Sequence, residues 1–126
     1  MPQKLLLLAD DEMLVRRLLQ PHLERAGYHT ITAENGRAAV ELAARELPEL
    51  IVMDVMMPEM DGLTALRRLK ANDATKAIPV VVITVNKHAA SRNEAQNAGA
   101  ASFLTKPFSP AQLLSEIKRL LPSGSG

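Results

Sequence analysis

Near the middle of the chain stands the segment Leu50-Ile51-Val52-Met53-Asp54, four apolar residues followed by an acid. A short run that is apolar throughout is typical of a strand that is buried on both faces of a parallel sheet. Pro58 and Gly62 follow the run, and both residue types mark turns. The segment therefore predicts a central strand whose carboxyl end presents Asp54, at the place where open α/β sheets bind their ligands.

A second apolar segment, residues 4–9, ends in the same way, because Asp10, Asp11 and Glu12 follow it. If the two strands are parallel neighbours, Asp10, Asp11 and Asp54 converge at one edge of the sheet. Carboxylates that gather at one place repel each other unless a cation lies among them. The two segments together therefore predict a site for a metal ion and a phosphoryl group.

The composition fits one domain and excludes several classes of function. The chain has 126 residues, enough for a single domain with a hydrophobic core. Its formal net charge of +1 provides no general attraction to nucleic acid or to anionic lipid, so we expect neither as a direct partner. The chain has no cysteine, which excludes disulfides and thiolate metal sites. It shows no signal peptide and no apolar run of membrane-spanning length, so we expect a cytoplasmic protein.

Strand and helix signals alternate five times along the chain. Such alternation predicts right-handed crossovers and a doubly wound α/β fold with a parallel five-stranded sheet and five helices. Residues 1–121 form the predicted domain, and residues 122–126 are expected to be a flexible tail or the start of a linker. The predicted strands are 4–9, 28–33, 50–53, 80–84 and 101–104, and the predicted helices are 11–26, 37–46, 63–72, 87–98 and 110–121.

Two local signals lie between or within these elements. Asn35 and Gly36 predict a turn before the second helix. Pro21 lies inside the first helix, where it removes a backbone hydrogen bond and should kink the helix at a cost of roughly 3 kcal/mol.

Five polar side chains fall at the carboxyl ends of the predicted strands, and together they suit phosphoryl chemistry. Asp11 and Asp54, with a backbone carbonyl just past Asp54, offer the hard oxygen ligands that Mg²⁺ prefers, and Asp10 could hold the ion through water. Asp54 could attack phosphorus and become an aspartyl phosphate. Lys106 would neutralise the transferring group, and the Thr84 hydroxyl would donate a hydrogen bond to it.

The motifs that carry these residues are similar to those of a known family, over nearly the whole chain. The chain resembles the response-regulator receiver domains of bacterial two-component signalling, in particular the chemotaxis regulator. The matching segments are LADDE (8–12), MDVMMPEMDG (53–62), VVIT (81–84) and FLTKPF (103–108). The resemblance implies a flavodoxin-like fold with the strand order 2-1-3-4-5.

The resemblance also implies a role for each matched residue. It implies a switch that accepts a phosphoryl group on Asp54 from a histidine kinase or a phosphotransfer protein in a two-component phosphorelay. Such a protein catalyses its own phosphorylation and dephosphorylation and is not an enzyme with an external substrate. A downstream protein or output domain would bind the face formed by the fourth helix, the fifth strand and the fifth helix. The implied assignments are Asp11, Asp54 and the Met56 carbonyl as Mg²⁺ ligands with Asp10 assisting, Lys106 on the phosphoryl group, and Thr84 and Phe103 as the switch pair.

Some positions depart from the family pattern. Val85 stands where the family usually has a smaller residue, so we hypothesise slow phosphorylation and slow hydrolysis, which Val85→Ala would accelerate. Met56 and Asn86 occupy the variable positions that tune hydrolysis, and Met56 offers no polar group to orient water. Ala101 and Ser102 replace acids that form salt bridges in the dimers of many transcription-regulating members, which argues against that mode of dimerisation.

Alternatives remain at the level of single residues and of function. Taken alone, Asp10 to Glu12 could cap a helix, Asp54 could be a turn residue, and Phe103 could belong to the core. An aspartate-dependent phosphohydrolase would use a similar set, but it usually carries a second Asp where this chain has Met56. A receiver-fold interaction module that is never phosphorylated is the other alternative.

Overall fold

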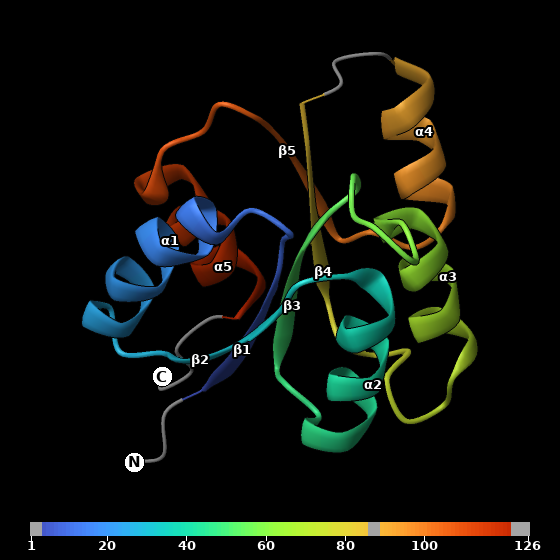
Figure 1. The fold of residues 1–126 in the computed structure, drawn as a ribbon, viewed down its shortest axis with the longest axis horizontal. Helices are drawn as coiled ribbons and strands as arrows, with labels where there is room; N and C mark the ends of the chain where they lie inside the picture. The colour runs from blue at the N-terminus through green and yellow to red at the C-terminus, as the bar shows by residue number, and fades with distance from the viewer. Residues whose placement is uncertain (1–3, 86–88, 122–126) are drawn as a thin grey trace.

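The computed structural model describes residues 4–85 and 89–121, and its centre is one parallel sheet (Figure 1). The strands lie in the order β2-β1-β3-β4-β5, and every neighbouring pair is parallel. The predicted doubly wound α/β fold and its strand order are thereby confirmed. The strands are β1 (Leu5–Ala9), β2 (His29–Ala33), β3 (Leu50–Asp54), β4 (Val80–Thr84) and β5 (Ser102–Thr105).

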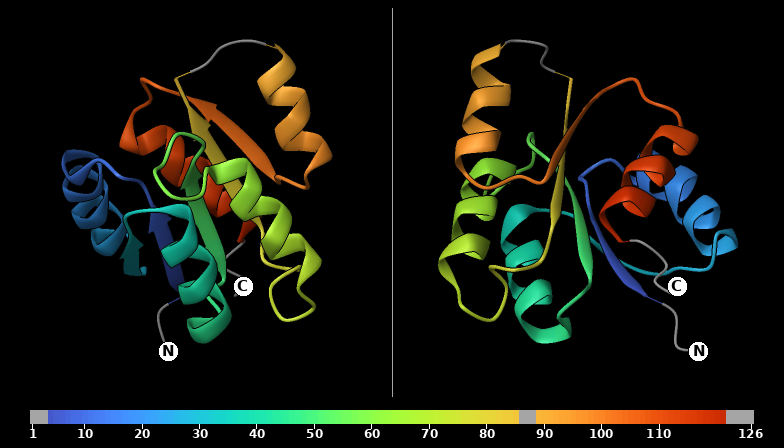
Figure 2. Two further views of the ribbon diagram at one scale, coloured as in Figure 1. Left: turned by 45° about the vertical axis from the view of Figure 1, so that its right-hand side comes forward. Right: turned by 180° about the vertical axis from the view of Figure 1, so that it is seen from behind.

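Five helices cover the two faces of the sheet. Helices α1 and α5 lie on one face, and α2, α3 and α4 lie on the other (Figures 1 and 2). β3 and β4 are buried at every position, because both of their faces are covered. This burial explains why their sequences are apolar without alternation. The helices are α1 (Met13–Arg25), α2 (Gly36–Glu46), α3 (Gly62–Ala71), α4 (Ala89–Asn97) and α5 (Pro110–Leu120).

Several predicted boundaries differ from the structure. Helix α1 begins at Met13 and not at Asp11, because the chain between β1 and α1 turns at residues 10–12. The helix continues through Pro21, whose ring is exposed, so the proline does not end it. The predicted turn at Asn35 and Gly36 is the start of α2, where the Asn35 side chain accepts a hydrogen bond from the Ala38 amide at 2.8 Å. Asn86, the first residues of the predicted helix 87–98 and the tail 122–126 lie outside the described residues.

Two glycines allow the segment between β3 and α3 to pack closely. A Cβ atom at Gly62 would lie 2.2 Å from the carbonyl oxygen of Asp54, and one at Gly36 would lie 2.0 Å from that of Met60. The Gly62 amide also donates to the Val55 carbonyl at 2.9 Å. A side chain at either glycine would therefore displace the backbone that carries Asp54 or the loop that follows it.

Candidate functional site

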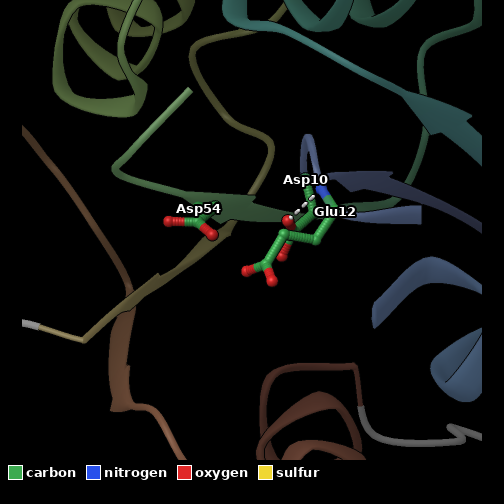
Figure 3. Close-up of side chains that lie close together, drawn as sticks. All are labelled: Asp10, Glu12 and Asp54. Atoms are coloured by element: carbon green, nitrogen blue, oxygen red, sulfur yellow. Dashed lines mark hydrogen bonds between the residues drawn. The ribbon is translucent and has the colours of Figure 1, made fainter. Parts of the chain in front are cut away.

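Two buried aspartates meet at the carboxyl edge of the sheet. Asp10 follows β1, Asp54 ends β3, and these strands are neighbours. Only 5% of Asp10 and 4% of Asp54 is exposed. Glu12 adds a third carboxylate, and one oxygen from each of the three acids lies within 4.8 Å of the others (Figure 3). The predicted convergence of Asp10 and Asp54 is therefore observed, with Glu12 beside them.

Backbone amides orient both buried carboxylates. The Glu12 amide donates to Oδ1 of Asp10 at 2.9 Å, and the Met56 amide donates to Oδ1 of Asp54 at 2.9 Å. In each case the donor is two residues further along the chain, where the turn after the strand places it. The second oxygen, Oδ2, of each aspartate is then directed toward a cation.

Lys106 provides that cation. Its Nζ lies 2.6 Å from Oδ2 of Asp54, 3.0 Å from Oε1 of Glu12 and 3.2 Å from Oδ2 of Asp10. The residue follows β5, and its backbone amide donates to the Thr84 carbonyl at 2.7 Å, which fixes the start of the turn. The side chain is only 13% exposed. One ammonium therefore joins three carboxylates that come from two other segments of the chain.

The burial of these groups changes their proton affinities. Burial raises the pKa of Asp10 to about 6, and the nearby charge of Asp54 adds to the rise, although the Glu12 amide and Lys106 act in the opposite direction. Burial alone would lower the pKa of Lys106. Hydrogen bonds to Asp54 and Glu12, with the charges of Asp54 and Asp10, outweigh that effect and raise the pKa above its ordinary value. Lys106 is therefore a cation at all physiological pH values.

We expect Asp10→Asn to stabilise the metal-free protein at pH 7 by about 1–3 kcal/mol, since one pKa unit corresponds to about 1.4 kcal/mol. The pKa of Asp10 rises from 3.8 to about 6 on folding, so between these values the folded protein binds the proton more readily than the unfolded chain does. The contribution of Asp10 to stability therefore falls as the pH rises through this window. The gain from asparagine should be complete above about pH 6 and absent below about pH 4.

Urea unfolding of both proteins in EDTA, at the two ends of this range, measures the difference in unfolding free energy. A stabilisation of equal size at acidic and at neutral pH would show that the carboxylate charge is not its cause.

The other predicted site residues differ in burial and in their place in the fold. Asp11 is exposed and is not part of the group of three carboxylates, so its role as a metal ligand stays a prediction. Thr84 is fully buried at the end of β4, beside the strand that ends in Asp54. Phe103 in β5 is partly buried and packs against the core on the face covered by α2, α3 and α4. The side chains of Met56 and Val85 are 65% and 62% exposed.

Glu12 is the site residue that the sequence prediction did not assign. Two signals were available in the sequence: Glu12 is acidic, and it lies two residues after Asp10. Asp11 is acidic as well, so acidity alone does not distinguish the two residues. The residue also lines a cavity of about 370 Å³ beside Lys106, together with Val85 and Phe108. The cavity is therefore lined mainly by apolar residues, and Glu12 and Lys106 are its charged members.

The acidic group suits a divalent cation such as Mg²⁺. Its donors are carboxylate oxygens, the ligand type that this ion prefers. The three carboxylates carry three negative charges, and Lys106 neutralises one of them. The two charges that remain match the charge of one divalent cation. Asp10 and Asp54 are the residues that would hold the ion, since they are buried and oriented by the backbone.

Comparisons with known proteins agree with this geometry. The family model of the response regulator receiver domain matches residues 6–118. The response regulator PleD of Caulobacter vibrioides is 41% identical over 115 residues, which cover 91% of this chain but 25% of PleD. This chain thus spans about a quarter of the length of that relative.

Two solved structures are similar over almost the full chain. The chemotaxis protein CheY4 of Vibrio cholerae superposes with a TM-score of 0.89 at 29% identity, over 94% of this chain and 99% of that one. The receiver domain of the sensor histidine kinase PA1611 from Pseudomonas aeruginosa has a TM-score of 0.88 at 28% identity, over 95% and 98% of the two chains. The latter structure holds a magnesium ion coordinated in its active site cleft.

In the described part of this chain, no helix has both the length and the apolar character that crossing a membrane requires. The family match covers almost the whole chain, and it agrees with the strand order and with the acids at the strand ends. The chain belongs to the family of response regulator receiver domains.

Proposed function

We propose that this receiver domain is a switch that accepts a phosphoryl group on Asp54 from a histidine kinase or a histidine phosphotransfer protein. The observation that carries the proposal is the 2.6 Å contact between Lys106 Nζ and Oδ2 of Asp54, at a buried edge that also holds Asp10. A buried carboxylate beside a fixed cation is a nucleophile that has charge stabilisation already in place for an incoming phosphoryl group.

The chemistry requires one bond to form and one to break. An oxygen of the Asp54 carboxylate attacks the phosphorus, and the bond from phosphorus to the imidazole nitrogen of the donor breaks. The imidazole keeps that electron pair and takes up a proton. Lys106 donates to the phosphoryl oxygens, and Asp10 contributes the second buried carboxylate. Mg²⁺, when bound by Asp10 and Asp54 with Asp11 and the Met56 carbonyl as further ligands, supplies charge neutralisation of the transferring group.

The response to phosphorylation is a shift between two states. We propose that Thr84, which ends β4, donates to the phosphoryl group, and that Phe103 in the neighbouring strand changes its packing in response. The face formed by α4, β5 and α5 then binds the downstream protein or output domain. The protein acts in the cytoplasm, and it catalyses only its own phosphorylation and dephosphorylation.

Incubation with acetyl phosphate and Mg²⁺ should add the mass of one phosphoryl group to the protein and none to Asp54→Asn. The added group should be labile to hydroxylamine, because an acyl phosphate is. Intact-protein mass spectrometry measures the gain, and its time course for Val85→Ala tests the proposed steric restriction at that position. A wild-type protein that gains no mass at saturating donor and metal would favour the interaction module that is never phosphorylated. Turnover of an unrelated phosphate ester would favour the phosphohydrolase.

A further inference from the structure

The ammonium group of Lys106 is fully engaged before any phosphoryl group arrives. It has three N–H donors, and three carboxylate oxygens, from Asp54, Glu12 and Asp10, lie within 3.2 Å of it. A phosphoryl group that approaches Asp54 needs at least one of these donors while Asp54 is still a carboxylate. One of the three acids must therefore give up its hydrogen bond to Lys106 before the new bond forms.

Glu12 differs from the two aspartates in how it is held. Each aspartate is buried and also accepts a hydrogen bond from a backbone amide, whereas the Glu12 side chain is 60% exposed. Within the described part of the chain, Lys106 is the one hydrogen-bond partner of the Glu12 carboxylate. Its release into water therefore costs the least, because an exposed carboxylate is readily hydrated and a buried one is not.

The position of Glu12 in its own helix supports a role at the site. Glu12 is the N-cap residue of α1, but its side chain makes no capping hydrogen bond. The carboxylate reaches instead to an ammonium 94 residues further along the chain. A change of this side chain therefore removes no cap, and its effects report on Lys106 and on the charge of the site.

We infer that Glu12 is a positioning residue that restrains phosphorylation by holding Lys106 until the phosphoryl group displaces it. Two effects act in the same direction. Glu12 withholds one donor of Lys106 from the transferring group, and its negative charge repels that group, which is itself an anion. The inference rests on the proposed function of Asp54, and it means that Glu12 slows the phosphorylation of that residue.

The test compares the rate constants for phosphorylation by acetyl phosphate at saturating Mg²⁺. Glu12→Ala, which removes both the charge and the hydrogen bond, should react about two- to fivefold faster than the wild type, the range expected for a partly exposed ion pair. Glu12→Gln should show a smaller increase, because its amide oxygen still accepts from Lys106 but carries no charge. Glu34→Gln is the matched control, since this exposed acid follows β2 at the same sheet edge and has no ion pair with Lys106; its rate should equal that of the wild type.

The affinity for Mg²⁺, measured by calorimetry, separates this role from that of a metal ligand. We expect it to fall by less than about fivefold in both Glu12 variants, because a partly exposed charge that makes no bond to the ion has only the modest effect of an exposed ion pair. A loss of more than about tenfold, together with slower phosphorylation, would make Glu12 a metal ligand and overturn the inference. Unchanged rates in both variants would overturn it as well.

A failure of the proposed function itself gives a different result, because the wild-type protein then gains no phosphoryl mass. Beryllofluoride with Mg²⁺, which imitates the phosphoryl group without a covalent transfer, is the probe in that case. Tighter binding of beryllofluoride to Glu12→Ala than to the wild type would support the restraint, and equal binding would contradict it.

Discussion

Replacement of Lys106 by methionine should lower the unfolding free energy of the metal-free protein by about 2–4 kcal/mol at pH 7. The methionine side chain fills a similar volume but leaves Asp10 and Asp54 buried without the cation that joins them. Breaking a buried ion pair from one side typically costs about 3–5 kcal/mol, and the exposure of Glu12 places this site at the lower end.

The loss should depend on pH in a defined direction. Lys106 lowers the pKa of Asp10, so without the ammonium the Asp10 carboxylate binds a proton still more readily in the folded protein than in the unfolded chain, and the variant loses stability as the pH rises. The difference from the wild type should be largest at neutral pH and smallest near about pH 4. Addition of Mg²⁺ at pH 7 should restore part of it, because the ion supplies the missing positive charge.

Urea unfolding with and without Mg²⁺ measures these changes. Lys4→Met is the matched control, because Lys4 pairs with Glu49 at 3.7 Å and both side chains are nearly half exposed. Such surface pairs contribute at most about 1 kcal/mol. If the two variants lost equal amounts, the neutralisation of the buried acids by Lys106 would be refuted.

Gly62→Ala should destabilise the protein by about 1–3 kcal/mol and weaken Mg²⁺ binding by more than about tenfold. The new Cβ would lie 2.2 Å from the carbonyl oxygen of Asp54 and 2.8 Å from the Cα of Val55. Both are backbone atoms, so the strand end that carries the Asp54 carboxylate has to move. In a helix without this contact, alanine would be more favourable than glycine by up to about 1 kcal/mol, so even the sign of the effect is informative.

Gly27→Ala is the matched control for this effect. Gly27 has a φ of 102°, which costs an alanine backbone strain, but its Cβ would meet no atom within 4 Å. This variant should therefore lose stability and keep the Mg²⁺ affinity of the wild type. Calorimetric titration with Mg²⁺ compares the two variants, and an unchanged affinity in Gly62→Ala would contradict the proposed coupling between the glycine and Asp54.

The fold could be predicted because the residues of each strand indicate how deeply that strand is buried. β3 and β4 are apolar at almost every position, and only a central strand covered on both faces has that property. The convergence of Asp10, Asp54 and Lys106 followed from topology alone, since all parallel strands end at one edge of the sheet. To place a residue at such a strand end, one needs the order of the strands and helices but not the orientation of any side chain.

The contacts that depend on side-chain direction could not be predicted in this way. Asp11 and Glu12 are adjacent acids, and which of them reaches Lys106 depends on the turn after β1, where the Glu12 amide bonds to Asp10. The close approach of Gly36 to Met60 joins the first residue of α2 to the loop between β3 and α3, and a local pattern contains no signal for it. The packing of Phe103 likewise depends on three helices, two of which, α2 and α3, lie far from it in the sequence.

The contacts of Lys106 also determine when the site can exist during synthesis of the chain. The ammonium meets Asp54 across 52 residues, Glu12 across 94 and Asp10 across 96. A growing chain emerges from its N-terminus, so both buried acids are present before the cation that offsets their repulsion. A growing chain that has not yet reached residue 106 lacks the ammonium that joins these acids. The site is therefore among the last parts of the domain to form.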